Sequence, residues 1–380
     1  MNKRGSYIVF VSIFFSAILV LIMAVIYYSG QVAISETTET FGRSWARSII
    51  SEYDRELLDR YGIRAYYGDK KTVEDKINKL IDYSYKEKSY INVSDLFLDI
   101  EPYSMTNLEN FESEVNFALK HFRMPKKIQN EIEEVHSNRY ILADWIIKGL
   151  PSNSIKVDKN WKLTLDDAYI FRFFKDYVNT RNLKETYFRN EIEYIISGKL
   201  DDNKARNSVK TKLSTMLEAQ NYGYLLRCPE KKNSVLTIAT ILCPEDPYAV
   251  YYGLLATWAA CETSNDIKIL YDEGKVPLLK SDENWATNIW SCIFGESSGK
   301  GYIPPKRMEG KDYDGYLDIL LKSIPASTKE LRMMDLIEIN LRFTYCDYFS
   351  FSDYYTGLYY SMKVNGKLHE FETDYEKQAW

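Results

Sequence analysis

One stretch carries the spacing of a catalytic nucleophile. Gly295-Glu-Ser-Ser-Gly299 matches the Gly-x-Ser-x-Gly pattern of serine hydrolases. That chemistry needs a strand, a sharp turn that exposes Ser297, and then a helix. Residues Trp290–Phe294 are compatible with a strand, but the following Lys300-Gly-Tyr-Ile-Pro-Pro305 cannot start a helix promptly. His369, the one histidine after Ser297, lies in a predicted hairpin. We therefore interpret the match as chance.

The same stretch approaches a phosphate-binding loop. The run from Gly295 to Lys300 is one residue shorter than that loop, and Gly301 stands where Ser or Thr would hold magnesium. We expect a flexible surface loop here, without a nucleotide.

Two carboxylates stand four residues apart on one face of a predicted helix, Glu262 and Asp266. Such a pair could bind a metal or perform acid–base chemistry. No histidine or third carboxylate stands at ligand spacing, so we expect a solvated or salt-bridged helix face. The pair Glu338 and Arg342, also four apart, is expected to support its helix, and Arg332 precedes Asp335 by three.

Histidines and cysteines are too scattered for a zinc site. His121 and His136 have no partner in the local sequence. The five cysteines form no Cys-x-x-Cys pair and are odd in number, so no complete disulfide framework is expected. They are Cys228, Cys243, Cys261, Cys292 and Cys346. Cys243 and Cys261 lie in apolar stretches and read as buried free thiols. We predict no catalytic, cofactor-binding or metal-binding residue, and no enzyme.

Composition favours long helices. The chain has 380 residues, of which 45% are apolar and 27% charged, so it can form a packed core. Only 17 Gly and 10 Pro are present, too few for a turn-rich all-β protein. The formal net charge is −5, and nucleic acid, which needs clustered positive charge, is not an expected partner.

The N-terminus reads as a membrane anchor. Residues Tyr7–Tyr28 are apolar or uncharged, and as a helix they span roughly 33 Å, enough for a bilayer core. Lys3 and Arg4 precede the span, which predicts a cytoplasmic N-terminus and an extracytoplasmic remainder in the cell membrane. The alternative is a cleaved signal peptide, but this run is longer than a signal peptide's and no Ala-x-Ala follows it.

The expected organisation has four parts. Residues 1–6 are a cytoplasmic N-terminus, 7–28 the transmembrane helix, 29–62 a stalk helix, and 63–380 an extracytoplasmic α+β domain that is predominantly helical. The stalk shows one apolar stripe at a step of four: Phe41, Trp45, Ile49, Tyr53, Leu57 and Tyr61. The region 235–261 is cut by Pro244 and Pro247 and predicts buried core helices, without a second span.

A small antiparallel sheet is expected beside the helices. Residues 90–103 alternate with period two, which is a strand signal. Leu358–Val364 and Lys367–Phe371 flank Asn365-Gly366, a strong signal for a two-residue hairpin. Further helices are predicted at 72–88, 107–149 (two helices, broken near 124–125), 166–178, 183–197, 204–226, 248–273, 313–322 and 329–345.

Several segments resemble an uncharacterised family of bacterial membrane proteins, domain of unknown function 5702. They are the anchor through Ser51–Gly62, then Asn190–Lys199, Trp258 through Lys280 to Trp285, and Arg332–Glu338. The resemblance implies no activity and no catalytic residues. In its anchor the family is similar to pseudopilins of tight-adherence pilus systems, which often carry a Glu five residues after a Gly. Here Phe10 stands five residues after Gly5, which departs from that pattern.

These observations predict a membrane-anchored structural or assembly component at the cell surface, and the resemblance suggests a pilus-like system. It would contact the lipid bilayer through residues 7–28, and an envelope protein or another copy of itself. The alternative is an exported binding module for cell-wall polymer or another surface ligand, in which some of the 32 tyrosines stack on sugars. A row of exposed aromatic side chains would favour the alternative.

Overall fold

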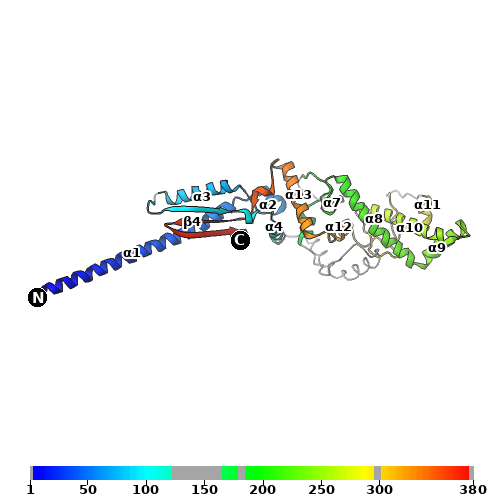
Figure 1. The fold of residues 1–380 in the computed structure, drawn as a ribbon. Coiled ribbons are helices and arrows are strands. Elements are labelled where there is room, and N and C mark those ends of the chain that lie inside the picture. The colour runs from blue at the N-terminus through cyan, green and yellow to red at the C-terminus, as the bar shows by residue number, and fades with distance from the viewer. Residues whose placement is uncertain (1–2, 87, 122–164, 179–184, 295–300, 376–380) are drawn as a thin grey trace. The chain divides into compact units, whose positions relative to one another are not determined.

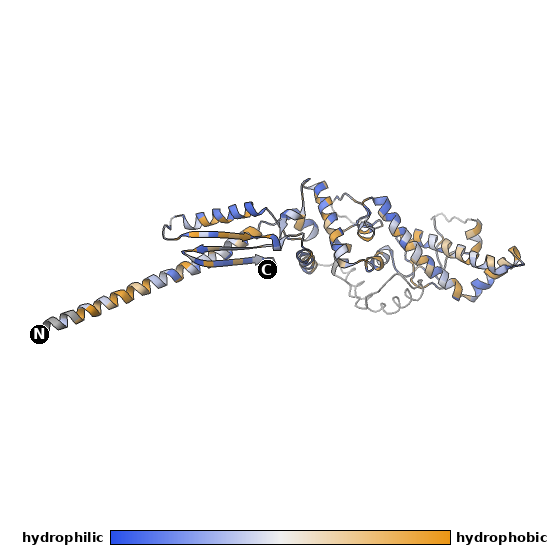
Figure 2. Cartoon of the chain, viewed as in Figure 1, coloured by the Kyte–Doolittle hydropathy of each residue, from blue (hydrophilic) through white to orange (hydrophobic). Residues whose placement is uncertain are grey.

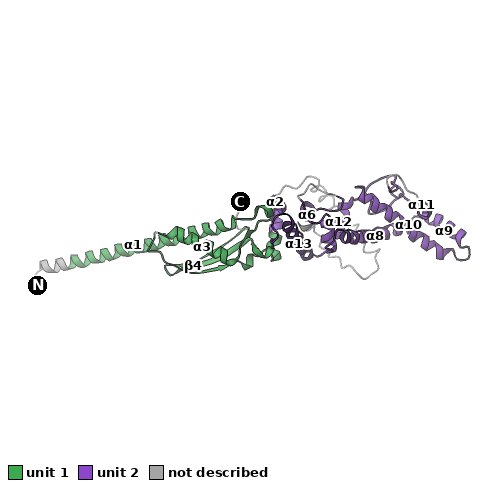
Figure 3. Ribbon diagram, turned by 90° about the horizontal axis from the view of Figure 1, so that it is seen from above, with its two compact units in different colours: residues 1–59, 63–113, 350–380 green, residues 60–62, 114–349 purple. Residues whose placement is uncertain are grey.

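The computed structural model describes residues 3–86, 88–121, 165–178, 185–294 and 301–375 (Figure 1). It is an α+β fold in which helices predominate, as the sequence predicts. The chain divides into two compact units (Figure 3). Unit 1 comprises residues 1–59, 63–113 and 350–380, and unit 2 comprises residues 60–62 and 114–349. Residues 63–380, which are predicted from the sequence as one domain, are divided between these two units.

Unit 1 is built on the first helix. Helix α1 runs from Lys3 to Ile50, and its apolar N-terminal part is exposed (Figure 2). The segment Phe10–Ile50 is long and apolar enough to cross a membrane, with a mean hydropathy of 2.7 in its most apolar window, none of which is buried. Among the described residues it is the one helix that meets these criteria, which agrees with the predicted anchor.

The second part of α1 forms the core of unit 1. Trp45 and Ile49 are buried there together with side chains of α3 (Lys70–Tyr85) and of a three-stranded sheet. The sheet has the antiparallel order β2 (Val93–Asp99), β4 (Gly357–Val364), β5 (Lys367–Asp374). Asn365 and Gly366 have φ of 50° and 81°, so the predicted hairpin turn is present. Shorter elements complete the unit: β1 (Tyr66–Tyr67), η1 (Glu101–Tyr103), η2 (Phe351–Asp353) and β3 (Tyr354–Tyr355).

The predicted stalk helix is interrupted. Helix α1 ends at Ile50, and α2 (Arg55–Tyr61) is a separate helix. Tyr53 forms a β-bridge with Tyr66, which takes the chain out of helical geometry. The Asp54 carboxylate then accepts a hydrogen bond from the N–H of Leu57 at 3.0 Å and starts α2 anew. The apolar stripe predicted at every fourth residue nevertheless continues beyond the break, because Leu57 of α2 is buried.

The named elements in the described part of unit 2 are helices, joined by loops. Three helices form one of its cores: α8 (Asp202–Arg227), α9 (Pro229–Leu242) and α10 (Pro247–Tyr271). The stretch 235–261 thus lies in core helices, as predicted from the prolines that divide it into two short apolar pieces. The other helices are α4 (Leu108–His121, which begins in unit 1), α6 (Leu165–Phe173), α7 (Glu191–Ser197), α11 (Ile289–Phe294), α12 (Tyr313–Leu321) and α13 (Ala326–Thr344).

The segment Trp290–Phe294, which is compatible with a strand by its sequence, lies in helix α11 (Ile289–Phe294). The side chain of Asn288 accepts a hydrogen bond from the N–H of Ser291 at 2.7 Å, which is helix capping at an N-terminus. The Gly-x-Ser-x-Gly residues 295–299, including Ser297, lie outside the described residues, as does His136.

Candidate functional site

Helix α10 brings Glu262 and Asp266 to one side of its axis, one turn apart, and both are buried. The Nζ of Lys280 lies 2.7 Å from Oε1 of Glu262 and 2.7 Å from Oδ1 of Asp266. The exposed fractions of the three side chains are 2% for Lys280, 0% for Glu262 and 1% for Asp266. The pair is therefore salt-bridged in the interior, and the expected solvated alternative is wrong. We call these three residues the Lys280 cluster.

Backbone and amide donors complete the Lys280 cluster. Glu262 accepts hydrogen bonds from the N–H groups of Ala286 (3.0 Å) and Thr287 (2.8 Å). Asp266 accepts one from Nδ2 of Asn221 on α8 at 3.0 Å. The cluster thus ties the loop 280–287 and two helices together, and each carboxylate has both a charged and a neutral donor.

Burial sets the titration of the Lys280 cluster. Burial, with a smaller contribution from the charge of Glu262, raises the pKa of Asp266 to about 6 against the attraction of Lys280. Burial lowers the pKa of Lys280, but Asp266 and Glu262 outweigh it and hold that pKa above the ordinary lysine value. Lysine therefore stays charged at neutral pH, and the cluster carries one net negative charge when both carboxylates are ionised.

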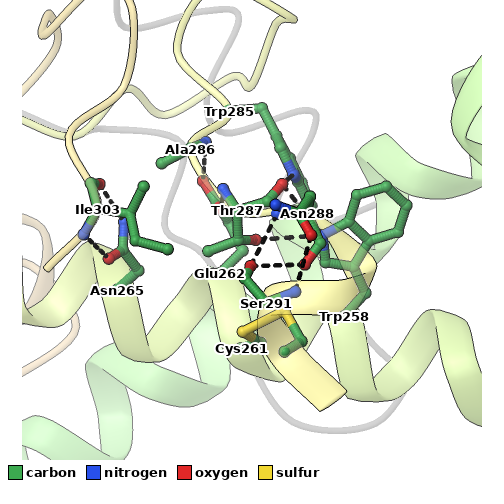
Figure 4. Close-up of a disulfide and its surroundings, with 11 residues drawn as sticks. Trp258, Cys261, Glu262, Asn265, Trp285, Ala286, Thr287, Asn288, Ser291 and Ile303 are labelled. Carbon is green, nitrogen blue, oxygen red and sulfur yellow. Dashed lines mark hydrogen bonds between the residues drawn. A yellow bond between two sulfur atoms is a disulfide. The ribbon is translucent and has the colours of Figure 1, made fainter. Parts of the chain in front are cut away.

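Aromatic rings and a disulfide enclose this region (Figure 4). Trp258 and Trp285 meet edge to face with ring centroids 5.6 Å apart. Their indole N–H groups both donate to Thr287. Cys261 and Cys292 form a disulfide that joins α10 to α11. The expectation of a free thiol at Cys261 is thus wrong, because the α11 turn brings Cys292 to a Cα–Cα distance of 5.8 Å. Cys228, Cys243 and Cys346 are free.

The geometry of the Lys280 cluster suits a structural role. An acid–base or nucleophilic group must reach a substrate, whereas these side chains are buried and already hydrogen-bonded. The ammonium group of Lys280 sits between the two carboxylates, where a bound cation would otherwise neutralise them. Among the described residues, no group of three or more His, Cys, Asp or Glu side chains is arranged to hold a metal ion.

A second buried polar group surrounds α7, and we call Glu191, Glu193 and their donors the α7 cluster. Glu191 accepts hydrogen bonds from Nδ2 of Asn340 (2.6 Å) and the N–H of Lys175 (2.9 Å). Glu193 accepts from the hydroxyl of Tyr313 (2.8 Å) and the N–H of Tyr177 (2.9 Å). Burial raises the pKa of each glutamate to about 7, although these donors oppose the shift.

The other end of α7 faces cationic side chains. Arg332 donates to the carbonyl of Ile195 at 2.6 Å, and Lys212 to that of Ile196 at 3.3 Å. Gly198 ends the helix in the left-handed conformation, with φ of 68°. Cations at a helix C-terminus satisfy its free carbonyls and complement its dipole.

Sequence reasoning located only part of these clusters. It singled out Glu262, Asp266 and Arg332, but not Lys280 or the α7 glutamates as a buried pair. The available signal for Lys280 is a lysine at the end of the apolar run Val-Pro-Leu-Leu. For Glu191 and Glu193 it is two acidic residues alternating with apolar ones in a short helix without exposed positions.

The remaining candidates stay apart from one another. His369 is buried on β5 and lies 2.9 Å from Oε1 of Glu39 on α1. His121 lies exposed at the end of α4, with its ring nitrogen 3.0 Å from the carbonyl of Phe117. Glu338 and Arg342 form the predicted ion pair on α13.

Three of the segments that carry the family resemblance lie in or beside these clusters. Tyr194, in the segment 190–199, donates its hydroxyl to Asp335 of the segment 332–338 at 3.0 Å. The segment from Trp258 to Trp285 contains the whole Lys280 cluster. No curated protein and no solved structure matches the chain. Residues 105–366 match a family of unknown function (DUF5702), more than half of the sequence, and the chain belongs to that family.

Proposed function

We propose that this protein is a single-pass membrane-anchored assembly component that acts on the extracytoplasmic side by protein contacts, without catalysis. The observation that carries the proposal is α1, a single helix whose exposed apolar part continues without interruption into the core of unit 1. Such a helix fixes a folded body directly to the anchor, without a flexible linker between them.

Two observations support an extracytoplasmic position. Lys3 and Arg4 precede the apolar part of α1, and positive residues favour the cytoplasmic side. The disulfide between Cys261 and Cys292 in unit 2 suits an oxidising compartment, since such bonds are rare in the cytosol.

The anchor also offers a surface for a neighbouring helix. Ser12 and Ser16 are exposed on α1, and the hydroxyl of Ser16 donates to the carbonyl of Ser12 at 2.9 Å. Small side chains at this spacing let two transmembrane helices approach closely. This spacing, together with the similarity of the family's anchors to those of tight-adherence pseudopilins, leads us to propose a pilus-like system. Phe10, which stands where those proteins often carry a Glu, argues against it.

The test begins with topology. Protease added to wall-stripped intact cells is expected to degrade unit 2, and full protection would contradict the orientation. Crosslinking in native membranes is expected to join the chain to an envelope protein or to a second copy. Replacing Ser12 and Ser16 with Leu should reduce contacts made by the anchor, whereas Phe14→Leu with Ile18→Leu serves as the matched control. Turnover of a wall-derived substrate by the purified protein, without any crosslink, would replace this function with an enzyme.

One observation favours the alternative, an exported module that binds wall polymer. On the sheet face opposite α1, Phe97 is exposed and meets the ring of Tyr359 edge to face, with centroids 6.4 Å apart. The Tyr359 hydroxyl donates to Glu370 at 2.8 Å. Aromatic faces beside hydrogen-bonding carboxylates can orient a sugar. Sedimentation with purified cell wall that is lost in Phe97→Ala and Tyr359→Ala, but not in Tyr83→Ala, would favour this module.

A further inference from the structure

The turn between α9 and α10 exposes large apolar side chains at one end of a helical hairpin. The exposed fractions are 73% for Ile241, 62% for Leu242, 61% for Tyr248 and 55% for Tyr252. Glu245 and Asp246 lie exposed in the turn between them. We call these six residues the hairpin tip, and Figure 2 shows hydrophobic and hydrophilic residues adjoining there. Apolar clusters of this kind on a protein surface mark interaction sites.

The apolar residues of the hairpin tip lie outside the buried core that α8, α9 and α10 form. They continue the same helical stripes that supply it: Leu242 stands seven residues after the buried Val235 on α9, and Tyr248 seven residues before the buried Leu255 on α10. The hairpin tip is thus the exposed end of an apolar stripe whose remainder is buried.

The hairpin tip is also held in a defined conformation. Asp246 caps α10 by accepting from the N–H of Ala249 at 3.4 Å, and Pro247 stands at the first helical position. The N–H of Cys243 donates to the carbonyl of Ala239 at 2.9 Å and closes the last turn of α9. A preorganised surface loses little conformational entropy when it binds.

The charge of the hairpin tip indicates the chemistry of its partner. From Asn233 to Ile267 the sequence contains no Lys or Arg. Its other two acidic residues, Glu262 and Asp266, are buried against Lys280. The outward charge of this stretch is therefore that of Glu245 and Asp246, both negative. A complementary surface would surround an apolar pocket with positive charge.

We propose that the hairpin tip is the docking surface for an envelope protein that presents an apolar pocket rimmed by Lys or Arg. This inference rests on the proposed contact function and names the surface that performs it. Exposed tyrosine and aliphatic side chains are the anchors, since buried aromatic residues dominate binding energy at interfaces. The interior of a bilayer would reject the two carboxylates, and a second copy docking through the same tip would bring four of them together.

The experiment places a photo-crosslinking phenylalanine analogue at position 248 of the full chain in native membranes. Tyr83 on α3 is the matched control position, because it is 87% exposed and follows the exposed Asp82. We expect a protein adduct from position 248, and its crosslinked peptide should map to an apolar pocket with Lys or Arg at the rim. Glu245→Lys should lower the adduct yield roughly tenfold, whereas Asp82→Lys should leave it unchanged. An unchanged melting temperature of Glu245→Lys shows that the fold is retained.

Other outcomes overturn the proposal. A lipid adduct, an adduct with a second copy, or a yield that Glu245→Lys does not change each contradict the stated partner. Absence of any protein adduct at position 248 also overturns it. If position 83 or the anchor then captures a protein, the contact function stands and only the hairpin tip is wrong. If no position captures a protein and the purified chain turns over a wall-derived substrate, the proposed function itself fails.

Discussion

Unit 2 buries two pairs of carboxylates, and the pairs differ in what stabilises them. Glu262 and Asp266 share the ammonium group of Lys280 and also receive neutral donors. Among the described residues, two backbone N–H groups, an amide and a tyrosine hydroxyl donate hydrogen bonds to Glu191 and Glu193, and the charge of Lys175 acts on Glu191 as a smaller influence. An ion pair keeps a buried carboxylate charged, whereas neutral donors leave its protonation near balance at physiological pH. The first arrangement should depend on its lysine, and the second should titrate at a higher pH, with a pKa of about 7 for each glutamate against about 6 for Asp266.

The largest expected effect is the removal of Lys280. Lys280→Met leaves two carboxylates buried without their cation and should lower the free energy of unfolding by about 3–5 kcal/mol. Denaturant unfolding followed by tryptophan fluorescence is the measurement, since Trp258 and Trp285 lie beside the cluster. Lys231→Met is the control, because its partner Asp282 is largely exposed and the loss should stay below about 1 kcal/mol. Equal losses in the two variants would contradict the assigned role of burial.

The disulfide gives the second effect. Cys261→Ser with Cys292→Ser releases a cross-link between residues 31 apart and should cost about 3 kcal/mol. The double substitution thus removes a cross-link that lies beside the Lys280 cluster, whereas no disulfide is described beside the α7 cluster. Thermal unfolding of both forms checks this. The chain that keeps both cysteines should unfold at a lower temperature only under reducing conditions. If reduction leaves its unfolding temperature unchanged, the pairing is contradicted.

The third effect is the pH dependence that the α7 cluster contributes. The folded-state pKa of Glu191 and Glu193 is about 7, above the ordinary glutamate pKa of 4.5. The folded chain therefore binds more protons than the unfolded chain between these values, and stability is lost as pH rises through about 7. Between pH 5.5 and pH 8, urea unfolding should show a loss of stability on the order of 2 kcal/mol from each of the two glutamates. Glu193→Gln should reduce the difference, and a difference that Glu191→Gln and Glu193→Gln leave intact must arise elsewhere.

The smallest effect concerns the C-terminal end of α7. Arg332→Met removes one donor to the carbonyl of Ile195 while Lys212 still serves that of Ile196. A loss of about 1 kcal/mol is expected, since a hydrogen bond and a favourable dipole contact both disappear. Arg307→Met, at an exposed pair with Glu309, is the control with little change. A loss as large as that of Lys280→Met would mean that Arg332 is also a buried charge pair.

Local patterns accounted for much of the fold. The Asn365-Gly366 turn was predictable because two left-handed residues in succession suit few other dipeptides. The long helices α8 and α10 were predictable to within a few residues from apolar periodicity. Helix α11 was not, since Trp-Ser-Cys-Ile-Phe has strand-forming residues, and a single cap at Asn288 decides its geometry.

The candidate clusters were less predictable, because they depend on contacts between distant segments. Glu262 lies on a helix with a clear period, but Lys280 reaches it from a loop 18 residues later that has no periodicity. Cys261 and Cys292 are likewise brought together only when α11 turns back on α10. Such pairings follow from how elements pack, which the spacing of residues along one element does not encode.

The strand order of unit 1 has a consequence for the chain during its synthesis. Strand β4 pairs with both β2 and β5, yet it is made only after the whole of unit 2. Until then Trp45 and Ile49 of the anchor helix lack the sheet that covers them. A chain that stops anywhere before residue 357 would leave this apolar face open, and proteases and chaperones recognise such unfinished proteins. The last strands to emerge thereby distinguish a complete molecule from a fragment.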